Sequence, residues 1–295
     1  MEVLNGNNNS DNFSTSKNIN KNLKKLINFY KVDLTKEELV KTFFKRKKFD
    51  LIIHLAAISG VQEFNKNILK NFNNNILTTK NLMRYGFKNN NTQFIFASSA
   101  AVYGKATSNR VSEKAKCDPI NFYGLSKQVC EKIIENYLDK RKIHYAILRY
   151  FNVVGSITKS KVEKKIYSLL DIICKNIKKK IYKVNINGKK LSTKDGTPER
   201  DFIHILDLCR IHEKTYLYLI KNKKVIMNCG SGKSYSVLQI VKEFEKSTNQ
   251  KFKIYYKKIH PNEIQTICSN INLLKKLLKI NIENNTISNL INDYL

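Results

Sequence analysis

Three short runs of apolar residues stand out in the first half of the chain, over residues 49–56, 93–97 and 143–150. Apolar runs of this kind, without polar alternation, are typical of strands that are buried on both faces of a parallel sheet. The segments near 66–86 and 122–140 repeat apolar positions with the period of a helix. This alternation of strands and helices predicts an α/β fold, in which helices cover both faces of a doubly wound parallel sheet.

The pattern is weaker after residue 155, although short apolar runs return at 183–186 and 225–228. We expect a main domain over 1–155. The segment 156–295 is then mainly a smaller α/β lobe, with stretches around 200–240 returning to the main domain. A chain of 295 residues is long enough for this arrangement.

The chain is strongly basic, because 54 Lys and Arg against 24 Asp and Glu give a formal charge of +30. Such a charge raises the alternative of a nucleic-acid-binding protein. The lysines, however, are spread along the whole chain, whereas a dedicated binding domain usually concentrates them on one element. Runs of Asn indicate a general compositional bias toward Lys, Asn and Ile. We therefore expect no nucleic-acid partner, although the positive field favours anionic substrates.

The six cysteines form no C-x-x-C pair, and the five histidines do not cluster with them. We therefore expect reduced cysteines in a core and no metal site. No run approaches the ~20 apolar residues that a membrane-spanning helix needs. The N-terminus also lacks the basic and apolar regions of a secretory signal. The sequence thus predicts a cytoplasmic protein that does not associate with membranes.

One motif resembles the end of a phosphate-binding loop, GSGKS at residues 230–234. The full motif would need a Gly at position 227, where Met227 stands. We interpret this segment as a turn before a helix.

Tyr123 and Lys127 are four residues apart in the second helical segment, so both side chains lie on one face of that helix. A free Tyr has a pKa of about 10, and a nearby ammonium lowers it by stabilising the phenolate. The pair is therefore a candidate general acid/base for proton transfer at a sugar hydroxyl. Alone, this spacing also occurs on exposed helix faces. Ser98 and Ser99 add hydroxyls at a predicted strand end, where parallel sheets bind their ligands.

These residues and their surroundings resemble the extended short-chain dehydrogenase/reductase family. The matching segments are FASSAAVYG at 96–104 and NFYGLSK at 121–127. Three more segments resemble the UDP-glucose 4-epimerases within that family: LRYFNVVG at 148–155, DGTPERDFIHILDL at 195–208 and MNCGSG at 227–232. The similarity runs from about residue 11 to residue 270, in the order and spacing of the family.

The resemblance implies a Rossmann-like fold and an NAD-dependent isomerase that interconverts UDP-glucose and UDP-galactose by transient oxidation at C4. It implies that 1–155 bind NAD, that the C-terminal lobe binds the UDP-sugar, and that the protein is a homodimer. The implied catalytic residues are Ser99, Tyr123 and Lys127. The implied NAD contacts are Asp11, Asn12, Asp33, Leu34, Ala56, Ala57, Asn74, Ser98, Tyr123, Lys127 and Tyr150. The implied substrate contacts are Ser99, Asn152, Arg200, His260 and Glu263.

Some of these residues also have plain structural interpretations. Asp11 lies in an Asn- and Ser-rich stretch that is typical of a turn. Arg200 is also a candidate for a structural ion pair. His204, within the 195–208 segment, is better interpreted as closing a core strand or loop than as touching substrate.

The N-terminus departs from the family pattern. The family begins with a strand and a G-x-x-G-x-x-G turn, whose backbone N–H groups approach the pyrophosphate. We interpret the ten residues before Asp11, which include Gly6, as a polar stretch without that strand or turn. The NAD-binding domain is therefore expected to be truncated. An incomplete translation of a longer gene and a decayed relative both explain this, and the retained Ser99, Tyr123 and Lys127 favour the first.

The substrate lobe departs as well, since His260 stands where the family usually has Arg and Glu263 where it has Asp. A neutral His is a weaker diphosphate partner than Arg. This difference leaves UDP-hexose and UDP-N-acetylhexosamine open as substrates.

Three alternatives to the epimerase remain. Nucleotide-sugar 4,6-dehydratases share the Tyr/Lys pair but need an acidic dipeptide where this chain has Ala100 and Ala101. UDP-glucuronate decarboxylases also share the pair, and the RYFN segment at 149–152 favours an epimerase over them. The third alternative is an inactive remnant that binds a nucleotide or a partner through its basic surface.

Overall fold

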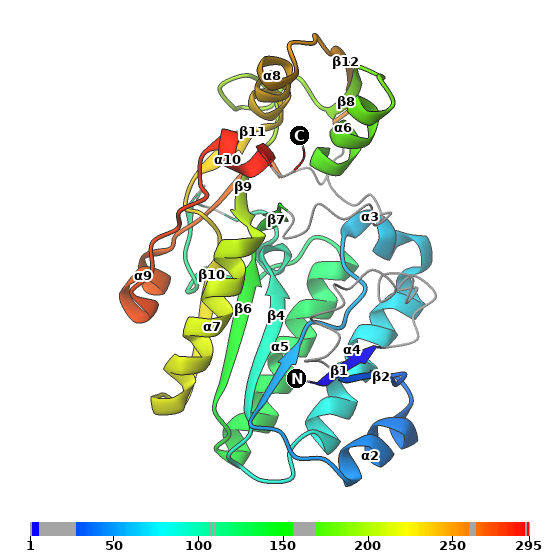
Figure 1. The fold of residues 1–295 in the computed structure, drawn as a ribbon, viewed down its shortest axis with the longest axis vertical. Coiled ribbons are helices and arrows are strands. Elements are labelled where there is room, and N and C mark those ends of the chain that lie inside the picture. Colours follow the sequence, from blue (N-terminus) through cyan, green and yellow to red (C-terminus); the bar gives the residue numbers. More distant parts are fainter. Residues whose placement is uncertain are drawn as a thin grey trace.

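The computed structural model describes residues 2–5, 28–106, 108, 110–155, 169–259, 264–292 and 294. Its central sheet is parallel throughout, with the strand order β10-β6-β4-β3 (Figure 1). These strands are β3 (Leu51–His54), β4 (Gln93–Ser99), β6 (Tyr145–Tyr150) and β10 (Lys224–Cys229). The three apolar runs of the sequence form β3, β4 and β6. The predicted α/β fold with a parallel sheet is thereby confirmed.

Helices cover both faces of this sheet. One face carries α4 (Ile68–Tyr85) and α5 (Phe122–Arg141), with α2 (Glu37–Lys45) packed on α4. The other face carries α7 (Ile205–Lys221) and α9 (Asn272–Leu278). The helices predicted near 66–86 and 122–140 are α4 and α5, so the helical periodicity located them correctly.

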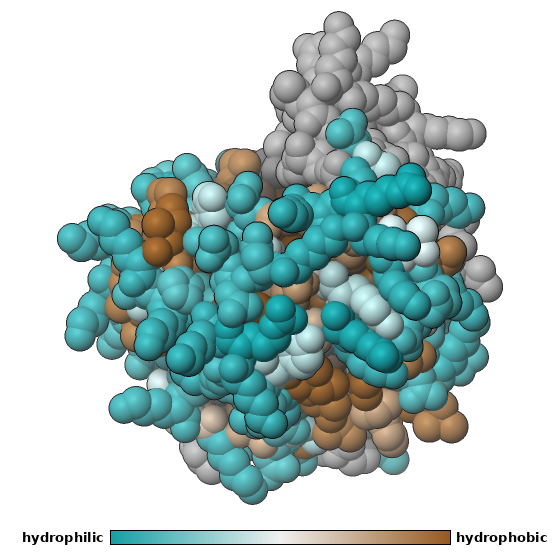
Figure 2. Space-filling model, turned by 90° about the horizontal axis from the view of Figure 1, so that it is seen from below, coloured by the Kyte–Doolittle hydropathy of each residue, from teal (hydrophilic) through white to brown (hydrophobic). Residues whose placement is uncertain are grey.

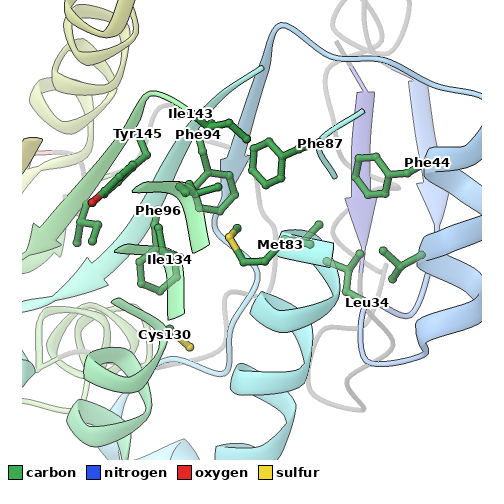
Figure 3. Close-up of a cluster of buried hydrophobic side chains, with 14 of the residues drawn as sticks. Leu34, Phe44, Met83, Phe87, Phe94, Phe96, Cys130, Ile134, Ile143 and Tyr145 are labelled. Atoms are coloured by element: carbon green, nitrogen blue, oxygen red, sulfur yellow. The ribbon is translucent and has the colours of Figure 1, made fainter. Parts of the chain in front are cut away.

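The side chains of β4 enter two different cores. Phe94 and Phe96 pack with Met83 and Phe87 on the α4 and α5 face, as Figure 3 shows. Ile95, between them, is buried in the core beneath α7 and α9. Because successive side chains of a strand point to opposite faces, a strand covered on both sides needs apolar residues at every position. This explains why the run showed no polar alternation.

A separate pair of strands lies at the N-terminal side. β1 (Glu2–Asn5) pairs in parallel with β2 (Asn28–Lys31). The sequence interpretation of the residues before Asp11 as a polar stretch without a strand was therefore wrong for this part. Pairing between backbone groups stabilises such a short strand, and it needs no long apolar run. In the described part of the chain, no strand joins β1 to β3, and the two sheets are not hydrogen-bonded to each other.

A further sheet lies beyond the carboxyl end of the central sheet. Its strand order is β11-β9-β13-β5, and β7 pairs with β9 in parallel. The strands are β5 (Arg110–Val111), β7 (Asn152–Val154), β9 (Glu199–His204), β11 (Ser234–Ser236) and β13 (Thr266–Ser269). This sheet connects the central sheet to the smaller lobe at the top of Figure 1.

The smaller lobe has its own core, which includes Ile186, Phe202 and Phe244. A two-stranded parallel sheet of β8 and β12 packs with three helices around it. The lobe elements are α6 (Leu169–Lys178), β8 (Lys183–Asn187), α8 (Val237–Thr248), β12 (Lys253–Lys257) and α10 (Ile287–Asn292). The weak apolar runs at 183–186 and 225–228 correspond to β8 and β10.

The surface is mainly hydrophilic on the face seen from below, with apolar side chains gathered in a few places (Figure 2). Within the described ranges, none of the helices is long and apolar enough to cross a membrane.

Candidate functional site

Helix α5 begins close to the end of β4. The side chain of Asn121 caps the helix by accepting a hydrogen bond from the Gly124 N–H at 2.8 Å. Gly124 allows a close approach to the short 3-10 turn after β4, Ala100–Tyr103. A Cβ at this position would lie 2.4 Å from the carbonyl oxygen of Ala101. This packing brings the first turn of α5 against the strand end that carries Ser99.

The structure brings Ser99, Tyr123 and Lys127 together at this point. The Tyr123 and Ser99 side chains are hydrogen-bonded, and Ser99 Oγ also accepts from the Ala101 N–H at 3.2 Å. Lys127 is buried, and its Nζ donates to the carbonyl oxygen of Ala97 at 2.7 Å. The hydroxyl, phenol and ammonium that acid/base chemistry at an alcohol requires are therefore assembled at the carboxyl end of β4.

The electrostatics of the Tyr/Lys pair differ from the prediction. Burial raises the pKa of Tyr123, and the hydrogen bond from Ser99 offsets this only in part. Burial also lowers the pKa of Lys127 to about 8, against weaker opposing effects of Cys130 and Glu131. The sequence reasoning considered only the ammonium, which lowers the pKa of a phenol. Desolvation, which the sequence does not show, disfavours the charged form of both groups.

The other predicted NAD contacts at strand ends lie along the carboxyl edge of the sheet. Ala56 and Ala57 are half-buried and lie two and three residues after the end of β3 at His54. Tyr150 is the last residue of β6 and pairs in register with Ser99. The Ser98 side chain is buried and donates to the Glu131 carboxylate. The Ser98 hydroxyl hydrogen is therefore used in a hydrogen bond within the protein.

Three further predicted NAD contacts lie at or near α2 and α4. Asp33 Oδ1 accepts hydrogen bonds from the Thr35 N–H at 3.0 Å and the Thr35 hydroxyl at 2.7 Å, so it orders the turn before α2. Leu34 is buried in the core. Asn74 is half-buried on α4.

Asn75 is a residue that the sequence reasoning missed. It is buried, its Oδ1 accepts from the Ile58 N–H at 2.9 Å, and its Nδ2 donates to Ser126 Oγ at 3.2 Å. It thus ties the loop after β3 to α5 at Ser126, the residue before Lys127. The run of three Asn gave no signal that would single it out from Asn74.

The predicted substrate residues that the structure describes lie on neighbouring strands. Asn152 is exposed on β7. Arg200 is half-buried on β9, and its Nη1 donates to the carbonyl oxygens of Glu199 and Gln265 at 2.8 and 3.3 Å. The remaining predicted contacts Asp11, Asn12, His260 and Glu263 lie outside the described residues.

His204 and the GSGKS segment have structural roles. His204 is buried and caps α7, with its Nδ1 accepting from the Leu206 N–H at 3.3 Å. The backbone N–H groups of Ser231 and Gly232 donate to the buried carboxylate of Asp201 at 2.7 and 3.0 Å. The loop that resembled a phosphate-binding motif therefore binds an internal carboxylate, before the helix α8 that the sequence predicted.

The chemistry of these side chains fits the nicotinamide end of NAD. Lys127 has an ammonium with three N–H donors, which suits the hydroxyls of a ribose. Tyr150 adds an aromatic ring at the carboxyl edge of the sheet, where it pairs in register with Ser99. Of the residues predicted at the adenosine end, Asp11 and Asn12 are outside the described part of the chain.

Comparisons with known proteins show the family of the chain. A family model described as the NAD dependent epimerase/dehydratase family matches residues 3–230. A UDP-glucose 4-epimerase of Drosophila melanogaster is 33% identical over 240 residues, which cover 77% of this chain and 67% of that protein. A UDP-glucose 4-epimerase of Yersinia enterocolitica is 33% identical over 229 residues, covering 76% of this chain and 68% of that protein.

Solved structures agree as well. The UDP-glucose 4-epimerase of Bifidobacterium longum, in complex with NAD+ and UDP, superposes with a TM-score of 0.87 at 25% identity, covering 100% of this chain and 89% of that one. The UDP-Glc/GlcNAc 4-epimerase of Campylobacter jejuni superposes with a TM-score of 0.83 at 29% identity, covering 99% of this chain and 89% of that one. The resemblance that the sequence motifs indicated is confirmed: the chain belongs to the NAD dependent epimerase/dehydratase family.

Proposed function

We propose that this protein is an NAD-dependent isomerase that interconverts UDP-glucose and UDP-galactose by inverting C4 of the sugar. The observation that carries the proposal is the assembly of Ser99, Tyr123 and Lys127 at the carboxyl end of the central sheet. Relatives with 33% identity over three quarters of the chain are UDP-glucose 4-epimerases. NAD supplies the redox chemistry at C4 when it is bound.

The side chains then have separate roles. Tyr123 exchanges a proton with the C4 hydroxyl of the sugar. Ser99 bonds the Tyr123 phenol and steadies that proton, since hydrogen bonding to the ionised form lowers the pKa of Tyr123. Lys127 holds the nicotinamide ribose through its ammonium and adds positive charge beneath the site.

The proposed binding residues follow from their places in the fold. We assign NAD to the domain over 1–155 and the UDP-sugar mainly to 156–295, with 200–240 contributing to both. Asn152 and Arg200 contact the UDP-sugar from β7 and β9, and Ala56, Ala57 and Tyr150 contact NAD. Arg200 suits a diphosphate because a guanidinium forms charge-assisted, paired hydrogen bonds with phosphate oxygens.

The dehydratase alternative is not favoured. The turn after β4 carries Ala100 and Ala101 next to Ser99, so this turn offers no carboxyl group to the substrate. Elimination of water from a sugar needs such an additional acid or base.

A direct experiment separates these activities. The purified protein with NAD is given UDP-galactose, UDP-N-acetylgalactosamine or UDP-glucuronate in parallel reactions. The proposal predicts UDP-glucose from the first, whereas release of carbon dioxide from the third would indicate a decarboxylase. Turnover of the second substrate in place of the first would assign the enzyme to N-acetylhexosamines.

We also propose a homodimer that forms through α4 and α5. Three large apolar side chains on these helices are exposed: Leu69, Leu77 and Phe122. Phe72 and Phe122 lie edge to face across the two helices, with centroids 6.2 Å apart. Sedimentation should give twice the chain mass, and Leu69→Glu together with Phe122→Glu should yield monomers. A monomeric unmutated protein would contradict this assembly.

The proposed location is the cytoplasm. Within the described residues the six cysteines form no disulfide, which is typical of proteins kept in a reducing compartment.

A further inference from the structure

A second tyrosine stands beside the catalytic one. Tyr150 ends β6, between Ser99 of β4 and Cys229 of β10 in the register of the central sheet. It lies near enough to Tyr123 for a negative charge on one phenol to disfavour a negative charge on the other. Two phenols at one site raise the question of which one exchanges protons with substrate.

The Tyr150 hydroxyl already has a partner within the protein. It lies 2.7 Å from Nε2 of His212, a half-buried residue of α7. The two rings meet edge to face, with centroids 5.7 Å apart and an interplanar angle of 70°. Nδ1 of His212 lies 2.9 Å from the carbonyl oxygen of Leu208, one helical turn earlier.

These contacts define the direction of the hydrogen bonds. A carbonyl oxygen only accepts, so Nδ1 of His212 carries the hydrogen. Burial lowers the pKa of His212, so the ring is neutral at physiological pH and Nε2 is an acceptor. Tyr150 must therefore donate its hydroxyl hydrogen to His212. A hydrogen bond that Tyr150 donates stabilises its neutral phenol, and it also fixes the orientation of its ring.

The environments of the two tyrosines are thus opposite. Tyr123 bonds to the hydroxyl of Ser99, an interaction that favours its ionised form. Tyr150 donates to His212, an interaction that favours its neutral form. We propose that His212 is a positioning residue, which holds Tyr150 as a neutral, fixed aromatic wall for the nicotinamide end of NAD and leaves proton exchange to Tyr123. This inference rests on the proposed function, because it assigns the NAD side of the same site.

The test compares NADH affinity among variants of the full chain, by fluorescence titration. His212→Ala removes the acceptor, Tyr150→Phe removes the donor, and the double variant completes a mutant cycle. His212→Gln keeps an acceptor near the position of Nε2. His144→Ala is the matched control, because Nδ1 of His144 lies 2.8 Å from the carbonyl oxygen of Leu219 on the same helix, at the opposite end of β6.

We expect His212→Ala and Tyr150→Phe each to raise the Kd for NADH about tenfold, the loss of one hydrogen bond. The double variant should be no weaker than either single variant, since the two residues act through one contact. His212→Gln should remain within about threefold of the unmutated protein. His144→Ala should lower the melting temperature to a similar extent but leave the Kd for NADH unchanged. In turnover, the His212 and Tyr150 variants should need a higher NAD concentration to reach half of their maximal rate.

The outcomes separate this inference from the proposed function. An unchanged Kd in His212→Ala, or additive losses in the double variant, would overturn the role of His212 alone. NADH binding without conversion of UDP-galactose would overturn the proposed function alone. A protein that does not bind NADH at all would overturn both.

Discussion

The guanidinium of Arg149 binds the carboxylate of Glu131 through two hydrogen bonds, 3.0 Å from Nε and 2.7 Å from Nη2, beneath the candidate active site. Both side chains are almost fully buried. The same carboxylate accepts from Ser98, and Arg149 Nη1 donates to the hydroxyl of Tyr103 at 3.0 Å. Glu131 lies one helical turn after Lys127, so this network connects the ends of β4 and β6 to the catalytic helix.

Removing one partner of this ion pair should destabilise the fold strongly. Glu131→Ala leaves the Arg149 charge buried without its carboxylate, which typically costs about 3–5 kcal/mol. Chemical denaturation would measure the loss. The matched control is Glu38→Ala, which breaks an exposed pair with Lys41 on α2 and should cost about 1 kcal/mol or less. Equal effects of the two substitutions would contradict the structural role of the buried pair.

Tyr123→Phe should remove activity but not the fold. The ring of Tyr123 packs against Phe64, with centroids 5.8 Å apart, and Phe keeps that contact. Loss of the acid/base hydroxyl should lower kcat about 10²- to 10⁴-fold. Tyr137→Phe, on the same helix, removes a hydroxyl whose one hydrogen bond among the described residues comes from Arg141 Nη1 at 3.3 Å, and it should leave kcat unchanged. Comparable kcat values for the two variants would exclude Tyr123 as the proton carrier.

The buried ammonium of Lys127 should lower the stability of the fold at neutral pH. Its pKa in the fold is about 8, against an ordinary value of 10.5. Between these pH values the unfolded chain holds a proton that the folded protein has released. The resulting loss in the free energy of unfolding is therefore complete below pH 8 and disappears as the pH rises toward 10.5.

Lys127→Met removes the buried charge. The variant should be inactive, but its free energy of unfolding at pH 7 should rise by up to about 3 kcal/mol. The gain should shrink by about 2 kcal/mol between pH 7 and pH 10. Urea denaturation of both proteins at the two pH values measures it. A variant that is less stable at pH 7 would show that the contact of Lys127 with Ala97 outweighs the cost of burying the charge.

His54 should contribute to acid sensitivity. It is buried next to Phe96, and burial, aided by the charge of Lys127, lowers the pKa of His54 to about 3. Between pH 6.5 and pH 3 His54 is protonated in the unfolded chain but neutral in the folded protein. The free energy of unfolding therefore decreases as the pH is lowered through this range. His54→Gln can still donate to Thr79 Oγ1, which lies 3.0 Å from Nε2.

The unmutated protein should therefore lose about 3 kcal/mol more stability than His54→Gln between pH 7 and pH 4. Unfolding free energies at the two pH values would decide. Parallel losses in the two proteins would assign the acid sensitivity to other groups.

Much of the fold followed from the sequence because its core strands are covered on both faces. The inner positions of such a strand are apolar on both faces, so β4 is visible as the run 94–97 and β6 as the run 145–148. β1 and β2 were not recognised, because two short strands that pair with each other depend on a partner far away in the chain. No local pattern carries that information.

The candidate site shows the same contrast. Tyr123 and Lys127 share a helix face and Ser99 ends a strand, so the spacing made them candidates, and the resemblance to a family suggested their roles. The predicted lowering of the Tyr123 pKa was wrong, because burial raises this pKa and burial depends on the folded chain. Asn75 and His212 were not predicted, because their hydrogen-bond partners Ile58 and Tyr150 are 17 and 62 residues away in the sequence.

The most direct test of the account is the conversion of UDP-galactose by the purified chain with saturating NAD, followed by ¹H NMR of the C4 proton of the sugar. The account predicts that UDP-glucose forms until the same equilibrium mixture is reached from either sugar, and that Tyr123→Phe reaches it at least about a hundred times more slowly. No conversion by the unmutated protein, or equal rates for the two proteins, would contradict the account.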